Sequence, residues 1–173
     1  MEFKRLTNSE DEFFDRAMAL YRQSFPYYEQ REERSQREIM RHGEYHFNLI
    51  FDGAQWVGIM LFWETEEFIY VEHFCIFPEL RNMRYGQRAL EHLGRAGKSV
   101  ILEIDPPVDS ISRNRKQFYE RCGFVENGFS HVHPPYHTGV KGHELVVMSK
   151  PEKLSQREYD RFKSYLENTV MPG

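Results

Sequence analysis

The spacing of apolar residues predicts two helices near the N-terminus, after a short strand over residues 2–6. Between residues 8 and 26, apolar side chains recur every three or four positions, which is the period of an amphipathic helix. The residues that define this face are Phe13, Phe14, Ala17, Leu20 and Tyr21. Asn8 or Ser9 is the expected N-cap, because acidic residues follow in the first turn, and Pro26 ends the pattern. A second, more polar helix is expected over residues 32–41.

The period then changes to that of strands. The runs "YHFNLIF" and "WVGIMLFW" flank Asp52-Gly53, a dipeptide that favours the tight turn of a hairpin. A third run, "FIYVEHFCIF", follows, and the three together predict an antiparallel meander. A helix over residues 85–96 is expected next, with Gly97 as its C-cap. The run "SVILEI" is typical of a short buried strand.

The C-terminal third predicts two more helices and two more strands. The helices are expected over residues 112–122, closed by Gly123, and over residues 155–168; the strands over residues 124–129 and 144–149. The segment between these strands, "SHVHPPYHTGVKGH", is too polar for a core and is expected to be a long loop. Strands pair first in hairpins and later alternate with helices, so the predicted fold class is α/β (α+β). We expect a mixed, mostly antiparallel central sheet flanked by helices, in a single domain over residues 1–173.

Composition narrows the class of protein without indicating a function. The chain has 173 residues, of which 40% are apolar and 15% aromatic, as expected for a folded globular domain. Its net charge of -4 argues against a nucleic-acid partner, because such proteins usually present a basic face. No apolar run approaches the roughly 20 residues that cross a bilayer, and the N-terminus lacks the apolar core of a signal peptide. We therefore expect no membrane partner and a cytoplasmic location.

The segment "VEHFCIFPELRNMRYGQRALEHLGRAG" has features of a phosphate-binding loop. A strand-like run stops at Pro78, and a loop with Arg81 and Arg84 then enters a helix that carries Arg88. The first N–H groups of a helix have no intrahelical partner, and together with the helix dipole they attract anions. Gly86 would let the backbone approach a ligand closely. By spacing alone, the segment fits either a diphosphate site or an ordinary solvated helix face.

Two motifs in this order resemble the GCN5-related N-acetyltransferases (GNAT). "VEHFCIFPELRNMRYGQRAL" is similar to the family's motif A, whose loop reads Q/R-x-x-G-x-G/A, and "FYERCGF" is similar to motif B. The resemblance covers roughly residues 49–129 and implies acetyl-CoA as co-substrate. It implies that the pyrophosphate is bound by Arg81, Asn82, Met83, Arg84, Tyr85, Gly86 and Gln87. Arg84 replaces the middle glycine of the motif, and a side chain is tolerated at this position if its backbone keeps a negative φ.

The resemblance also implies roles for residues outside this loop. It makes Tyr119 the general acid that protonates the departing thiolate. It places a strand bulge at Cys75 and Ile76, whose backbone amides would bind the thioester carbonyl and the pantetheine. Members of the family often have an Asn that contacts the cofactor seven residues before this Tyr. In this chain Ser112 occupies that position, and a helix cap is the simpler role for a serine there.

Two glutamates stand out because they interrupt apolar strands. A buried Glu is costly unless it is solvated or paired. Glu72 is the candidate catalytic base, with a salt bridge under a neighbouring loop as an equal alternative. Glu103 is placed in the same way and is expected to act in substrate binding or as a reserve base. Tyr136, which follows Pro134-Pro135, is expected to face the acceptor.

The predicted function is direct transfer of an acetyl group from acetyl-CoA to a primary amine of a small molecule or peptide. One alternative is a non-catalytic acyl-CoA-binding or regulatory module of the same fold, which the Arg84 substitution motivates. Another is a metal-binding protein that uses His131, His133, His137 and His143, although no Cys lies near them, and we assign no metal site. The sequence leaves a homodimer open.

Overall fold

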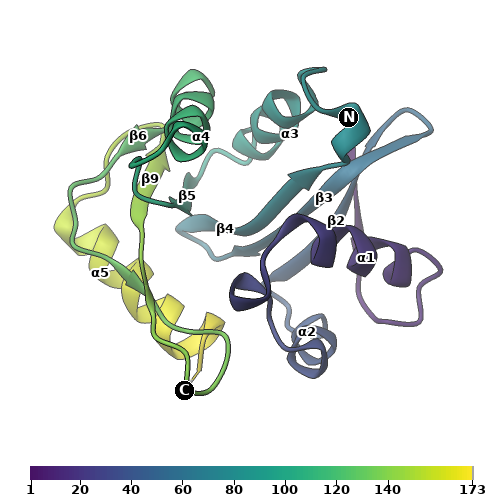
Figure 1. Cartoon of the computed structure of the whole chain (residues 1–173), viewed down its shortest axis with the longest axis horizontal. Helices are drawn as coiled ribbons and strands as arrows, with labels where there is room; N and C mark the ends of the chain where they lie inside the picture. The colour runs from purple at the N-terminus through teal and green to yellow at the C-terminus, as the bar shows by residue number, and fades with distance from the viewer. Residues whose placement is uncertain (173) are drawn as a thin grey trace. The chain divides into compact units, whose positions relative to one another are not determined.

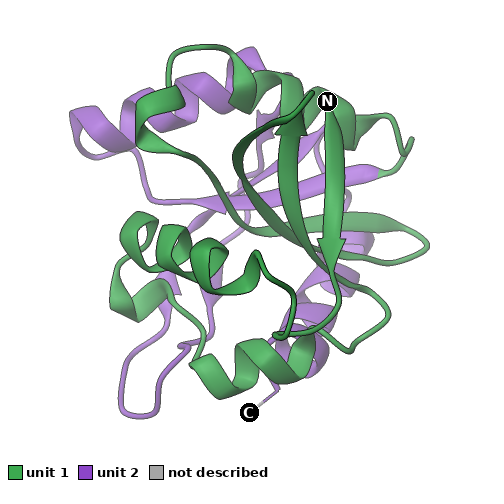
Figure 2. Cartoon of the chain, turned by 90° about the vertical axis from the view of Figure 1, so that its right-hand side faces the viewer, with its two compact units in different colours: residues 1–98 green, residues 99–173 purple. Residues whose placement is uncertain are grey.

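The computed structural model describes residues 1–172 and divides the chain into two compact units. The first unit covers Met1–Lys98, and the second begins at Ser99 (Figure 2). Each unit combines antiparallel strands with helices, which confirms the predicted mixed α/β class.

The first unit is built on four antiparallel strands in the order of the chain (Figure 1). They are β1 (Glu2–Leu6), β2 (Tyr45–Asp52), β3 (Gln55–Glu64) and β4 (Phe68–Ile76). Asp52 pairs with Gln55, and Gly53 takes the positive φ of 59° that the tight connection between β2 and β3 requires. The predicted meander is thus confirmed. Residues 56–63 of β3 are all buried, which requires cover on both faces of the sheet.

Helices supply that cover. They are α1 (Phe14–Ser24), α2 (Glu33–Ile39) and α3 (Tyr85–Gly94), with single 3-10 turns η1 (Tyr27–Glu29) and η2 (Pro78–Leu80). On α1, Phe14 packs against Phe47 of β2, whereas His92 of α3 packs against Phe3 of β1. Phe3 pairs with Ile50, which points to the face opposite Phe47, so α1 and α3 cover opposite faces.

Helix α1 begins later than the sequence indicated. Asn8 and Asp11 do not cap it; their side chains instead accept the backbone N–H groups of Glu10 and Phe13, each at 2.9 Å. Such local bonds stabilise turns in competition with a helix. Residues 8–13 therefore form turns, and the N-cap position falls to Phe13.

The second unit contains β5 (Ser99–Ile104), α4 (Ser110–Arg121), β6 (Val125–Glu126) and β9 (Val146–Lys150). Strand β9 pairs antiparallel with both β5 and β6. Helix α5 (Gln156–Tyr165) begins with a Ser155–Glu158 capping box and continues as the π-helical segment η3 (Leu166–Val170). The strand predicted over residues 124–129 ends after two residues, because Asn127 instead bonds to Ser149 and Leu154, at 2.8 Å each.

Part of the polar segment that was predicted to be a loop forms two short strands, and some of its side chains are buried. Within it, β7 (Val132–His133) pairs with β8 (His143–Glu144). His131, His133 and His137 are buried, which corrects the expectation that this segment is too polar to contribute to the interior.

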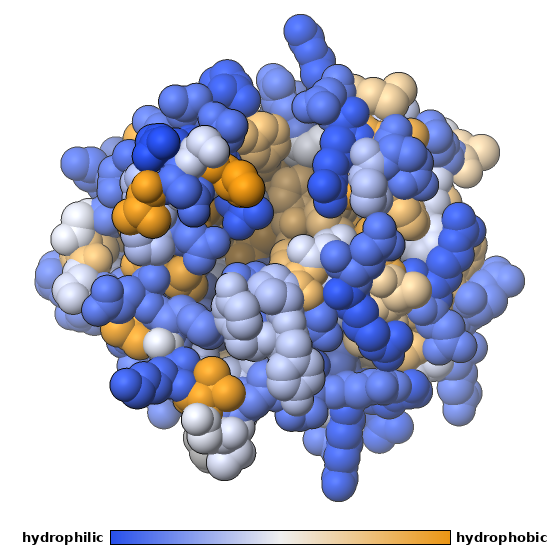
Figure 3. All heavy atoms as spheres, in the orientation of Figure 1, coloured by the Kyte–Doolittle hydropathy of each residue, from blue (hydrophilic) through white to orange (hydrophobic). Residues whose placement is uncertain are grey.

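Hydrophilic side chains cover most of the outer surface seen in Figure 3. Within residues 1–172, none of the helices has the length and apolar character that crossing a membrane requires.

Gly58 of β3 provides a test of how closely β3 and β4 pack. A Cβ at this position would lie 2.2 Å from the carbonyl oxygen of Cys75 and 3.0 Å from the Cα of Ile76. Gly58→Ala is expected to lower the free energy of unfolding by about 1–3 kcal/mol, as overpacking typically does. Urea denaturation measures this, with Gly43→Ala as the control because its Cβ would meet nothing within 4 Å. Equal stability of the two variants would contradict the packing.

Candidate functional site

The connection between β4 and α3 has the backbone geometry of an anion site. Asn82 and Arg84 both adopt left-handed conformations, with φ of 64° and 63°. Left-handed residues in such loops help to turn successive N–H groups toward one concave side, where an anion can bind. Arg84 is the N-cap of α3, and the first intrahelical bond runs from Arg88 N to Arg84 O at 3.0 Å. The N–H groups of Tyr85, Gly86 and Gln87, which precede Arg88 in the helix, therefore have no intrahelical acceptor and are available to a ligand.

The backbone of Arg84 corrects an expectation. A side chain was expected to be tolerable here with a negative φ, but the residue takes the left-handed conformation that a glycine adopts without steric cost. A side chain in this conformation costs on the order of 1–2 kcal/mol. Arg84 thus keeps the backbone shape of the motif glycine that it replaces.

The three arginines near this loop have different roles. The Arg88 guanidinium binds both oxygens of Asp52, at 2.8 and 3.0 Å, and so fastens α3 to the end of β2. Arg81 and Arg84 are exposed. Among residues 1–172, no carboxylate lies within 4.0 Å of either of these two guanidinium groups. Arg81 and Arg84 can therefore contribute charge to a bound anion, whereas Arg88 is already paired.

Glu72 is fully buried and paired at both of its oxygens. Arg31 Nη2 lies 2.6 Å from Oε1, and Trp63 Nε1 donates to Oε2 at 2.7 Å. Burial by itself would raise the pKa of Glu72, but the Arg31 guanidinium, His73 and the Trp63 hydrogen bond outweigh it and lower the pKa to about 2. A carboxylate with so low a pKa is a weak proton acceptor. The geometry favours the buried ion pair over the catalytic base.

The bulge of β4 lies at Glu72. Leu61 pairs with His73 and Phe62 with Val71, so Glu72 is the extra residue in the ladder with β3. The resemblance had implied a bulge at Cys75 and Ile76, but there the ladder with β3 is regular. Burial raises the pKa of the Cys75 thiol to about 11, so this thiol stays protonated near neutral pH and is a poor nucleophile.

Tyr119 lies on α4, where its half-buried ring contacts Phe118 and Phe124 at centroid distances of 5.2 and 5.7 Å. The start of α4 is fixed by a capping box: Asp109 Oδ1 accepts the Ser112 N–H at 2.7 Å, and Ser112 Oγ accepts the Asp109 N–H at 3.1 Å. Ser112 thus takes part in capping, as expected, although the N-cap itself is Asp109.

In the second unit, the structure brings together residues that the sequence had singled out separately. Glu103 Oε2 lies 2.5 Å from His131 Nε2, and Glu103 Oε1 lies 4.0 Å from His133 Nε2. The Tyr136 ring stacks on the His133 ring, with a centroid distance of 5.0 Å. Tyr159 of α5 completes the cluster, with its hydroxyl 2.8 Å from His131 Nδ1. Tyr159 lies in the helix predicted over residues 155–168, and no local signal in the sequence indicated this contact.

The histidines of this cluster do not form a metal site. Within residues 1–172, no group of three or more His, Cys, Asp or Glu side chains is arranged to hold a metal ion. The His133 Nδ1, for example, lies 2.6 Å from the carbonyl oxygen of Pro134.

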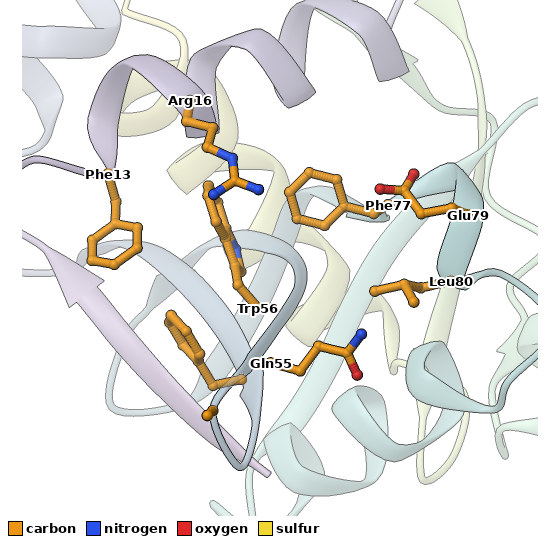
Figure 4. A pocket seen from close by; sticks show the side chains of 9 residues that line it. Phe13, Arg16, Gln55, Trp56, Phe77, Glu79 and Leu80 are labelled. Carbon is orange, nitrogen blue, oxygen red and sulfur yellow. The ribbon is translucent and has the colours of Figure 1, made fainter.

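A separate cavity of about 410 Å³ lies in the first unit, at the β2–β3 turn (Figure 4). Its walls include Phe13, Trp56, Phe77 and Leu80, and the Arg16 guanidinium lies over the Trp56 ring at 5.0 Å. None of the residues predicted to act in acetyl transfer lines this cavity, so we assign it no part in the reaction.

Comparison with known proteins places the chain in a family. The family model "Acetyltransferase (GNAT) family" matches residues 11–124, so the chain belongs to the GNAT acetyltransferases. This membership confirms the predicted class, an acyl-CoA-dependent N-acetyltransferase. No protein of curated function matches the sequence.

Solved structures agree with the family. A protein from Bacteroides thetaiotaomicron that is assigned to the GNAT family is 33% identical and has a TM-score of 0.93, covering 99% of this chain and 98% of that chain. An aminoglycoside 6'-N-acetyltransferase complexed with coenzyme A is 17% identical, with a TM-score of 0.61 and coverage of 87% and 96%. The ribosomal-protein-S18-alanine N-acetyltransferase from Escherichia coli is 16% identical, with a TM-score of 0.59 and coverage of 89% and 95%. The last two likenesses concern the fold alone.

The pairing of Glu72 predicts a dependence of stability on pH. Its pKa is lower in the folded state than its ordinary value of 4.5, so the unfolded state binds more protons between these two values. The stabilisation is therefore present above about pH 4.5 and is lost as the pH falls toward 2. Urea unfolding of the native protein should show this loss between pH 5 and pH 2, with a smaller slope in Glu72→Gln. Parallel stability curves for the two proteins would contradict the ion pair.

Proposed function

We propose that this protein transfers the acetyl group of acetyl-CoA directly to a primary amine of a small molecule or peptide. The observation that carries the proposal is the loop over residues 81–87. Its two left-handed residues lead into the unpaired first amides of α3, which suits a diphosphate. Membership in the GNAT family and the likeness to an acetyltransferase complexed with coenzyme A support the same donor.

In this proposal the loop binds the diphosphate of acetyl-CoA. The backbone amides of Asn82, Met83, Arg84, Tyr85, Gly86 and Gln87 supply the donors, whereas the Arg81 N–H is already bonded to Pro78 O at 3.4 Å. The guanidinium groups of Arg81 and Arg84 add charge. The backbone amides of Cys75 and Ile76 bind the pantetheine and the thioester carbonyl, where they would stabilise the oxyanion of the tetrahedral intermediate.

The chemistry requires two proton transfers. An alkyl ammonium has a pKa near ~10, so the amine must lose a proton before its lone pair can attack the thioester carbon. The C–S bond then breaks, and Tyr119 gives its phenolic proton to the thiolate. The raised pKa of Cys75 supports direct transfer to the amine over an acyl-cysteine intermediate.

A primary amine is the proposed acceptor. The two distant structures named above act, by their descriptions, on an aminoglycoside and on the alanine of a ribosomal protein, and both acceptors are amines. Tyr136 is proposed to contact the acceptor, and Glu103 is proposed to take part in acceptor binding through the cluster that it forms with His131 and His133, because an aromatic ring and a nearby carboxylate both suit a cation.

Tyr119→Phe tests the general acid. The substitution removes the hydroxyl and keeps the ring, so kcat is expected to fall by about 10²–10⁴-fold while the Kd for CoA stays the same. Thiol release from acetyl-CoA is measured with three acceptors: spermidine, a peptide with a free N-terminal amino group, and an aminoglycoside. Tyr165→Phe on α5 is the matched control and should retain full activity. An unchanged kcat in Tyr119→Phe would remove this residue from the mechanism.

The wild-type protein in the same assay tests the proposed function itself. CoA binding without thiol release to any amine would overturn the proposed function and favour the non-catalytic acyl-CoA-binding module.

The matched pair Arg84→Gly and Arg84→Ala tests the loop. Both variants lack the guanidinium, but only glycine relieves the positive φ of 63°. Arg84→Gly is expected to be more stable than Arg84→Ala by about 1–2 kcal/mol and to bind CoA more tightly.

Calorimetry with CoA and with pantetheine, which lacks the diphosphate, should give at least about tenfold weaker binding for pantetheine, a difference of about 1.4 kcal/mol in binding free energy. Equal affinity for both compounds would show that the loop does not bind the diphosphate.

A further inference from the structure

The hydrogen bonds of His131 assign its tautomer. Glu103 Oε2, a carboxylate oxygen, can only accept, so the proton of the 2.5 Å contact lies on His131 Nε2. His131 Nδ1 then accepts the hydroxyl proton of Tyr159 at 2.8 Å, which is much shorter than the 3.5 Å from this hydroxyl to Ser130 O. Burial raises the pKa of Tyr159, which keeps that proton in place. Both ring nitrogens of neutral His131 are therefore satisfied, and neither is left to accept another proton.

His133 is arranged in the opposite way. Its Nδ1 lies 2.6 Å from the carbonyl oxygen of Pro134, which can only accept, so Nδ1 carries the proton. In the neutral ring the lone pair is then on Nε2. This atom is buried and has no hydrogen-bond partner among residues 1–172, and the side chain is only 4% exposed. A buried acceptor without a donor costs about 1–3 kcal/mol, so this atom favours a hydrogen-bond donor from outside residues 1–172.

The surroundings of His133 hold the ring in place and suit a positive charge. Glu103 Oε1 on β5 lies 4.0 Å from Nε2, and the Tyr136 ring stacks on the imidazole. His143 pairs with His133 across β7 and β8, and His131 lies two positions earlier in the chain. The hairpin closes tightly, since a Cβ at Gly142 would come within 2.8 Å of His133 O. Of these titratable neighbours, Glu103 is the one whose charge would stabilise an imidazolium.

We propose that His133 is the catalytic base for the acceptor amine, with Glu103 holding the charge of the imidazolium that forms. The inference rests on the proposed function and adds a residue to it. The N–H bond of the ammonium breaks, its electron pair stays on the amine nitrogen, and the proton bonds to the His133 Nε2 lone pair. The amine then attacks the thioester. Its second proton leaves as the amide forms and balances the one that the thiolate takes up, so that one proton is released to water through His133.

This assignment gives the base a different location from the one predicted. Both oxygens of Glu72 are occupied by Arg31 and Trp63, whereas the Nε2 lone pair of His133 is unused. Glu103 acts through His133, which makes it a positioning residue in this mechanism.

The substitution His133→Asn separates catalysis from structure. The Asn amide can still donate near the position of Nδ1 to Pro134 O, but the Nε2 acceptor is lost. With acetyl-CoA and the most active amine of the panel, kcat/KM at pH 7 is expected to fall by about 10²–10⁴-fold, with the Kd for CoA unchanged. The deficit should shrink as the pH is raised, because more of the amine then arrives already deprotonated. A deficit that is equal at every pH would overturn the proposal.

Two further variants serve as comparators. His92→Asn on α3, where the ring only packs against Phe3, should behave as the wild type. Tyr159→Phe removes the donor to His131 but keeps the ring contact with Phe129 at 4.1 Å. Any loss in Tyr159→Phe should not be rescued at high pH, because His133 is intact. Rescue in Tyr159→Phe equal to that in His133→Asn would contradict the assignment of the base.

Long-range ¹H–¹⁵N NMR of the imidazole rings tests the tautomers without any turnover. In the free enzyme at neutral pH, His133 should carry its proton on Nδ1, and His131 should carry its proton on Nε2. A His133 proton on Nε2 at neutral pH would overturn the proposal. The expected tautomers in a protein that acetylates no amine would overturn the proposed function and leave the tautomer of His133 standing.

Discussion

Glu72 and Glu103 lie in strands that are otherwise apolar, and a buried carboxylate is tolerated only with polar or charged partners. Each finds its partner far along the chain: Arg31 is 41 residues from Glu72, and His131 is 28 residues from Glu103. These two bonds decide where residues 25–31 and 130–144 pack. The first segment is also tied to β4 by the contact of His73 Nε2 with Glu29 O at 2.7 Å, and the second to α5 through Tyr159. Segments that could have been loose connections are thereby held in place.

The same requirement leaves the two carboxylates with different chemistry. Arg31 brings a permanent charge to Glu72, so that carboxylate stays ionised and is a poor proton acceptor. Glu103 is bonded to a neutral imidazole, and its remaining negative charge faces His133. Both glutamates interrupt an apolar strand in the sequence. Their chemistry differs because Glu72 is paired with an arginine, whereas Glu103 is paired with a histidine.

The loop before α3 illustrates how a motif can persist when its residue changes. What an anion requires is a set of backbone N–H groups turned inward, and this depends on φ and ψ at residues 82 and 84. Glycine reaches that conformation freely, and Arg84 reaches it at a steric cost. The cost is small compared with the packing of α3 and the Arg88–Asp52 pair that hold the loop at its end. Arg84 then adds a positive charge that glycine could not.

Much of the fold followed from the sequence, because hydrophobic period and turn residues act over a few positions. The meander of β2, β3 and β4, the start of α3 and strand β5 were all predicted in this way. Predictions of element ends failed where side chains bond to the backbone or to other side chains in place of regular structure: locally at Asn8 and Asp11 before α1, and over a distance of 22 residues at Asn127 after β6. For the site, the sequence alone singled out a candidate phosphate loop, Tyr119 as a candidate general acid and two glutamates in apolar strands. Only the tertiary structure decided that Arg31 neutralises Glu72 and that His131 and His133 flank Glu103, because these pairs join residues that no local pattern connects.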